Sequence, residues 1–195
     1  QDHIRKLINF DVIAENPQYI VVDSMYGSGR GVIKGLLEGT GCEVHEIRNE
    51  MNPGFGGVHP EPIGQYLSAL SGAICMGKGT IGLATDGDAD RIGAMDERGV
   101  FVDPHKIMAL ALTYLAEKRK LKGLVVRTVS STRMIDLLAE RYGLTVQETP
   151  VGFNHIANYM LSEPVILGGE ESGGISFLGH IPEGDGIIMG LLLVE

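Results

Sequence analysis

Three aspartates stand two residues apart in residues 85–91, which read Thr-Asp-Gly-Asp-Ala-Asp-Arg. Their side chains can converge only if the backbone curls around one point, and the intervening glycine and alanine leave room for that. Three carboxylates held close together repel one another unless a cation neutralises them. All-oxygen ligands select a hard ion, Mg²⁺ before Mn²⁺ or Ca²⁺. The spacing therefore predicts a Mg²⁺ site made by Asp86, Asp88 and Asp90.

Three other interpretations of this segment remain open. In an EF-hand, these aspartates would take loop positions 1, 3 and 5 and Glu97 position 12, but position 6 needs glycine and is Arg91. An Asp-x-Asp pair after a strand also opens the haloacid-dehalogenase phosphatases, which need Thr or Val where Asp90 stands. A solvated acidic turn after a strand is the plain structural alternative.

A second candidate loop covers residues 168–174, Gly-Gly-Glu-Glu-Ser-Gly-Gly. Its glycines let the backbone approach a ligand closely. Ionised Glu170 can only accept hydrogen bonds, whereas Ser172 both donates and accepts. This set suits vicinal sugar hydroxyls, which need an acceptor facing each O–H group. The alternative is an ordinary strand-to-strand turn.

The elements that must position these loops alternate short apolar strands with helices, which is typical of an α/β fold. We expect strands at residues 19–23, 42–47, 80–85, 92–95, 124–128, 144–148 and 165–167, and helices at 32–38, 63–70, 132–142 and 153–161. The order strand, helix, Gly, strand occurs at residues 20–47 and again at 124–148. We predict two similar α/β domains, residues 1–100 and 101–195, with mixed, mostly parallel sheets flanked by helices.

Composition narrows the class of protein further. A formal net charge of −9 argues against a nucleic-acid partner, because a phosphate backbone attracts a basic face. No apolar run reaches the length of a membrane helix, so we expect no membrane partner. Two cysteines, Cys42 and Cys75, give no disulfide framework. They are expected as buried free thiols, which suits a reducing cytoplasm.

Taken together, residues 86–91 followed by residues 169–174 resemble the metal and sugar loops of the α-D-phosphohexomutases, a family of phosphoglucomutases, phosphomannomutases and phosphoglucosamine mutases. Further segments resemble the family in family order, at residues 21–29, 55–62, 149–153 and 179–186. The resemblance covers essentially the whole chain.

The resemblance implies four domains around one cleft, of which this chain holds the second and third. Asp86, Asp88 and Asp90 would bind Mg²⁺, and Arg91 would lie beside a phosphoserine phosphate in a catalytic role. Further substrate-binding residues are implied by the same comparison: Glu170 and Ser172 on the hexose hydroxyls, and Arg127 at a basic position lining the cleft. For Arg127 a solvated strand end remains an equal alternative.

The implied activity interconverts hexose 1-phosphate and hexose 6-phosphate through a phosphoserine and a hexose 1,6-bisphosphate. Two departures from the family matter. Asn154 stands where many relatives have Lys, and no Thr-Ala-Ser-His-Asn-Pro-like serine loop occurs. That loop belongs to the first domain of the family. The first and fourth domains would be the missing partners of this chain, from the same parent protein. We therefore expect the chain alone to be inactive, and a non-catalytic metal- or sugar-binding module is the alternative.

Overall fold

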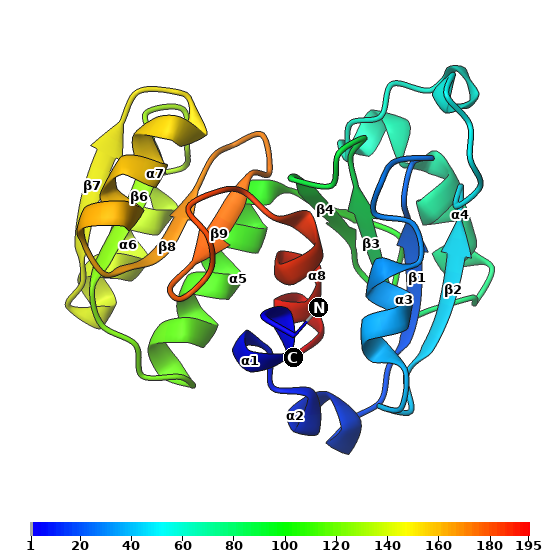
Figure 1. The fold of residues 1–195 in the computed structure, drawn as a ribbon, viewed down its shortest axis with the longest axis horizontal. Coiled ribbons are helices and arrows are strands. Elements are labelled where there is room, and N and C mark those ends of the chain that lie inside the picture. The colour runs from blue at the N-terminus through cyan, green and yellow to red at the C-terminus, as the bar shows by residue number, and fades with distance from the viewer. Residues whose placement is uncertain (1) are drawn as a thin grey trace.

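The computed structural model describes residues 2–195 and contains two sheets that stand side by side (Figure 1). The first has the strand order β2-β1-β3-β4-β5 and the second β7-β6-β8-β9. The strands are β1 (Tyr19–Asp23), β2 (Glu43–Ile47), β3 (Ile81–Thr85), β4 (Ile92–Met95), β5 (Phe101–Val102), β6 (Leu124–Thr128), β7 (Thr145–Thr149), β8 (Val165–Gly169) and β9 (Ile175–Phe177). In each sheet the first three strands pair in parallel and the next pairs antiparallel. The predicted α/β class, with its mixed sheets and internal repeat, is confirmed.

Helices cover both sheets and fill the space between them (Figure 1). They are α1 (Ile4–Leu7), α2 (Phe10–Glu15), α3 (Val32–Leu37), α4 (Ser68–Cys75), α5 (Pro104–Glu117), α6 (Met134–Tyr142), α7 (Phe153–Ser162) and α8 (Gly186–Val194), with short 3₁₀ turns η1 (Phe55–Gly57) and η2 (Gly64–Tyr66). Within residues 2–195, no helix combines the length and apolarity that crossing a bilayer requires.

Helix α8 joins the two halves. It follows the second sheet in the chain, yet it packs against β3 and β4 of the first sheet as well as against α5 and β9. Residues 186–192 are all buried, as expected for a helix that is apolar on every side. One hydrophobic cluster consequently contains residues of both sheets, among them Val22, Ile92, Val125 and Leu167.

Two expectations were wrong in detail. The helix expected at residues 63–70 is a 3₁₀ turn, η2, followed by α4, which begins at Ser68 and continues to Cys75. Leu67, with φ −103° and ψ 20°, interrupts the helical backbone between them. Cys75 is an exposed free thiol rather than a buried one, because it ends α4 beside the β4–β5 turn, whereas Cys42 is half-buried.

The topology places the two candidate loops on one edge. Parallel strands β3 and β8 end at Thr85 and Gly169, and the chain enters the aspartate segment and the Glu-Glu-Ser segment directly after them. The carboxyl ends of parallel strands are where open α/β sheets bind ligands. Both sheets turn this edge to the same side of the molecule, the upper side in Figure 1.

Candidate functional site

The metal loop, which we define as residues 86–91, brings the three predicted aspartates together. One carboxylate oxygen of each of Asp86, Asp88 and Asp90 lies within 4.8 Å of the other two. Asp86 is buried, Asp90 half-buried and Asp88 exposed, so the cluster opens to solvent on one side. This geometry matches the oxygen ligand set of a hard divalent cation.

The pKa of Asp90 shows that it is unfavourable for all three carboxylates of this cluster to be ionised together. Burial and then the neighbouring Asp86 and Asp88 raise the pKa of Asp90 to about 7. Its Oδ1 atom is buried without a hydrogen-bond partner among the described residues. Arg91 Nε lies 3.6 Å from this oxygen, beyond hydrogen-bond distance. A carboxylate oxygen that is buried without a hydrogen bond beside two other carboxylates fits a bound cation, which would offset the burial and the repulsion that raise the pKa.

Arg91 ends the metal loop and neutralises its innermost carboxylate. The Asp86 Oδ2 atom accepts a hydrogen bond from Arg91 Nε at 2.7 Å, and Asp86 Oδ1 accepts one from the Arg91 backbone N–H at 3.2 Å. Burial alone lowers the pKa of Arg91, but the hydrogen bond and charge of Asp86, together with the charges of Asp90 and Glu61, outweigh it and raise the pKa above its ordinary value. The guanidinium therefore stays charged.

Glu61 also belongs to the site, and sequence reasoning gave it no role. Its Oε1 lies 3.5 Å from Arg91 Nη1, so Arg91 is held between Glu61 and Asp86. The sequence did offer a signal for Glu61. This carboxylate stands between Pro60 and Pro62, in a segment that resembles the family.

The turn after β1 supports the metal loop from below. The Ser28 backbone N–H donates to Gly87 O at 2.9 Å, and a Cβ at Gly27 would lie only 2.4 Å from Asp86 O. Arg30 Nη1 donates to the carbonyl oxygens of Tyr26 and Gly27, which fixes this turn. The Gly-rich turn thus packs against the metal loop and holds its backbone in place.

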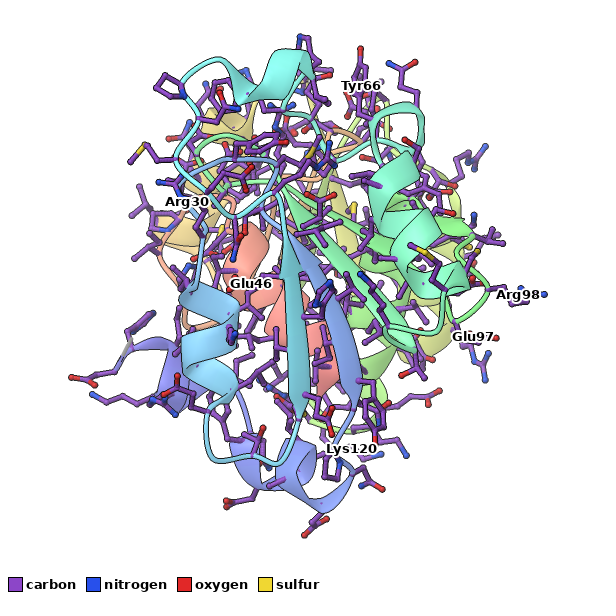
Figure 2. All side chains as sticks on the ribbon, turned by 90° about the vertical axis from the view of Figure 1, so that its right-hand side faces the viewer. Arg30, Glu46, Tyr66, Glu97, Arg98 and Lys120 are labelled. Atoms are coloured by element: carbon purple, nitrogen blue, oxygen red, sulfur yellow. The ribbon has the colours of Figure 1, made fainter. Side chains whose placement is uncertain are left out.

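The EF-hand interpretation is wrong. Strands β3 and β4 flank the metal loop as an antiparallel pair, from Thr85 opposite Ile92 to Gly82 opposite Met95. The aspartates precede β4, whereas Glu97 follows its far end. Figure 2 shows Glu97 beside Arg98 in the turn.

The sugar loop, which we define as residues 170–174, places Glu170 and Ser172 around one small space. A Cβ built at Gly174 would lie 3.4 Å from Glu170 Oε2 and 3.9 Å from Ser172 Oγ, so a larger residue there would enter the space between them. Glu170 Oε1 accepts from the Gly152 backbone N–H at 2.9 Å, which leaves Oε2 for another donor. Burial raises the pKa of Glu170 above its ordinary value.

Glu171 has a different partner from Glu170 and anchors the sugar loop to the end of β6. Its Oε2 accepts a hydrogen bond from Thr128 Oγ1 at 2.9 Å. Burial alone raises the pKa of Glu171, but hydrogen bonds that include those from Ser130 and Thr128 outweigh it and hold the pKa below its ordinary value. Nothing in the sequence distinguished this carboxylate from its neighbour Glu170.

Arg127 is not brought to the two loops by its described contacts. Its guanidinium pairs with Asp136 on α6 and Glu148 on β7, both at 2.9 Å, and also donates to Thr128 O. The residue is only 6% exposed, so the solvated strand end considered from the sequence is wrong. These contacts orient the end of β6 next to Glu171.

The site thus combines a carboxylate cluster, a fixed arginine and a glycine-bounded loop of polar side chains at one edge of two α/β units. Such a fold and site define an α/β protein with an acidic cluster beside a polar loop. The sequence profile described as phosphoglucomutase/phosphomannomutase, alpha/beta/alpha domain II, matches residues 1–99, and that of domain III matches residues 103–195. The chain belongs to the α-D-phosphohexomutase family.

Individual relatives agree with this assignment. A phosphoglucosamine mutase of an Exiguobacterium species is 35% identical over 91% of this chain and 39% of its own length. A phosphoglucosamine mutase of Carboxydothermus hydrogenoformans is 38% identical over 90% of this chain and 40% of its own. A Thermus thermophilus structure, provisionally described as a phosphomannomutase, superposes with a TM-score of 0.93 and 36% identity, over 99% of this chain and 45% of its own. The chain therefore spans less than half the length of these relatives.

Proposed function

We propose that this chain is the central part of a phosphohexomutase, which interconverts hexose 1-phosphate and hexose 6-phosphate through a phosphoserine and a bisphosphorylated sugar. The observation that carries the proposal is the metal loop and the sugar loop on one edge of a phosphohexomutase fold. The names of the relatives include mutases of glucosamine and mannose phosphates, which supports hexose phosphates as the substrate class.

Asp86, Asp88 and Asp90 would hold Mg²⁺. When bound, the ion would supply charge neutralisation, which phosphoryl transfer requires more than covalent help from the protein. The Oδ1 of Asp90, which is buried without a hydrogen bond, and the crowding of three carboxylates support this assignment. Arg91, fixed by Asp86 and Glu61, would direct its remaining N–H groups to a phosphoryl group on the exposed side of the metal loop.

Glu170 and Ser172 would orient the sugar. Glu170 Oε2 accepts from one hydroxyl, and Ser172 Oγ can donate to or accept from a neighbouring one. Because both sugar orientations must be accepted during the reaction, a small pocket bounded by glycine is suited to this role. Arg127 is proposed as a substrate-binding residue from family position alone, and its two ion pairs favour an indirect contribution.

The remaining requirements belong to the parent enzyme. Its phosphorylated serine and the groups that grip the substrate phosphate would come from the first and fourth domains of the same chain. We also propose that the second and third domains meet near residue 100, with α8 packed across that division.

A coupled assay on glucose 1-phosphate tests the proposal. The parent enzyme should form glucose 6-phosphate with Mg²⁺ and stop when EDTA removes the metal. The isolated 195-residue chain should show no turnover, because its sequence contains no serine loop. Turnover by the purified chain, or a parent enzyme unaffected by EDTA, would overturn the proposal.

A further inference from the structure

The metal loop and the sugar loop are connected by their main chains. The Ile92 backbone N–H donates to Gly173 O at 3.1 Å, and Arg91 and Gly174 form an antiparallel β-bridge. The contact joins residues more than 80 positions apart and links the first sheet to the second. In Figure 1 the loop that follows β8 reaches towards the segment that enters β4.

Only glycine allows this approach. Gly173 has φ +101°, and a Cβ there would lie 2.7 Å from Ile92 O and 3.2 Å from Ile92 N. Real Cβ atoms do not come so close to backbone atoms, and a side chain at this φ is strained as well. The sugar loop therefore contacts the metal loop directly, with no side chain between the two backbones.

The metal loop needs external support because its own conformation is unfavourable. Ala89 adopts φ +68°, a left-handed conformation that costs a non-glycine residue about 1–2 kcal/mol. Its carbonyl accepts a hydrogen bond from the Gly186 N–H at 2.9 Å, at the start of α8. Two contacts from the second half of the chain thus hold the curl that makes the aspartates converge.

We propose that Gly173 is a positioning residue for the metal loop, and that the sugar loop and the metal site are energetically linked through it. The proposal rests on the proposed function, because it assigns metal to the aspartates and sugar to residues 170–174. Linkage is reciprocal, so an ion that orders the metal loop also orders the sugar loop. The factor by which a bound ion strengthens hexose phosphate binding is also the factor by which bound hexose phosphate strengthens ion binding.

The variant Gly173→Ala tests the contact, with Gly39→Ala as a matched control. Gly39 also has a positive φ, +85°, but a Cβ there would meet nothing within 4 Å. In the metal-free chain we expect the amides of residues 86–92 to exchange about 10-fold faster in Gly173→Ala and at the wild-type rate in Gly39→Ala. Mg²⁺ affinity, measured by calorimetry, should fall about 5-fold or more in the first variant only.

A second measurement needs no substitution and remains informative if Gly173→Ala fails to fold. Saturating Mg²⁺ should slow amide exchange in residues 170–176 of the wild-type chain, although these residues contribute no ligand. Unchanged exchange there, or wild-type exchange of residues 86–92 in folded Gly173→Ala, would overturn the linkage. A wild-type chain that binds no Mg²⁺ would sink the metal assignment instead, and the metal-free exchange comparison would still decide whether Gly173 positions the loop.

Discussion

The ionised form of Asp90 is unfavourable in the metal-free fold, and a bound cation would stabilise it. Its pKa of about 7, against 3.8 for an ordinary aspartate, means that the metal-free fold opposes ionisation of this carboxylate. A group whose folded-state pKa is raised in this way lowers stability as pH rises from about 4 to 7. The proposed metal site requires the same ionised form, so binding a cation would offset this loss of stability.

The variant Asp90→Asn should therefore stabilise the metal-free chain at pH 8, because it removes one of three neighbouring negative charges. The increase in Tm over wild type should shrink as pH falls to 5, where Asp90 is protonated in the wild-type fold. Added Mg²⁺ should raise the Tm of wild type but not of the variant. An Asp90→Asn chain that is less stable than wild type at pH 8 without metal would contradict this account.

The effects of substituting Asp88 and Glu97 on Mg²⁺ affinity can be compared. Asp88 is an exposed carboxylate inside the metal loop, and Glu97 lies just beyond β4. Asp88→Asn should weaken Mg²⁺ binding about 10-fold or more, since it removes a charged ligand. Glu97→Gln should change the affinity less than about 2-fold, because Glu97 lies beyond the far end of β4. Isothermal titration of both variants checks this, and a loss in Glu97→Gln alone would revive the EF-hand arrangement.

The turn between β1 and α3 positions the metal loop, because its backbone packs directly against the backbone of that loop. Gly27→Ala should destabilise the chain by about 2 kcal/mol, since its Cβ would overlap the carbonyls of Asp86 and Gly87. Gly35→Ala, within α3 and with open space around it, should instead stabilise by about 0.5–1 kcal/mol. Urea unfolding measures both. Equal effects of the two substitutions would show that the turn does not support the loop.

Sequence reasoning predicted the local elements well and the contacts between them poorly. The three aspartates were predictable because their ligand spacing lies within one short segment after an apolar strand. The break at Leu67 was not predicted, and the 3₁₀ turn before it lies against a distant residue, with Gly64 next to the Phe101 ring. Likewise, the pairing of Ile92 with Gly173 depends on how two sheets dock, which no local pattern encodes. Arg127 shows the same limit, since its partners come from α6 and β7.

At the scale of the whole molecule, α8 and the sugar loop tie the second half of the chain to the first. The two loops therefore lie at one site, and we propose separate tasks for their side chains. Glu170→Gln in the parent enzyme should lower kcat/KM about 10- to 100-fold, since one hydrogen bond to a charged group is worth roughly 1.5–3 kcal/mol. Mg²⁺ affinity should survive, because the backbone bridge at Gly173 does not involve this side chain.

Glu171→Gln provides the matched control for that measurement. Its carboxylate accepts from Thr128 within the protein, and the glutamine oxygen can still accept there, so the loss in kcat/KM should be smaller. A larger effect at Glu171 than at Glu170 would exchange the roles of the two carboxylates.

Diffraction from crystals of this chain grown with Mn²⁺ tests whether the three aspartates hold a cation next to the sugar loop. Mn²⁺ shares the oxygen preference of Mg²⁺ and gives an anomalous signal that locates it without ambiguity. We predict one strong anomalous peak between the carboxylates of Asp86, Asp88 and Asp90, about 2.0–2.3 Å from an oxygen of each. A peak at the β4–β5 turn near Asp96 and Glu97, or no peak among the three aspartates at saturating Mn²⁺, would contradict the account.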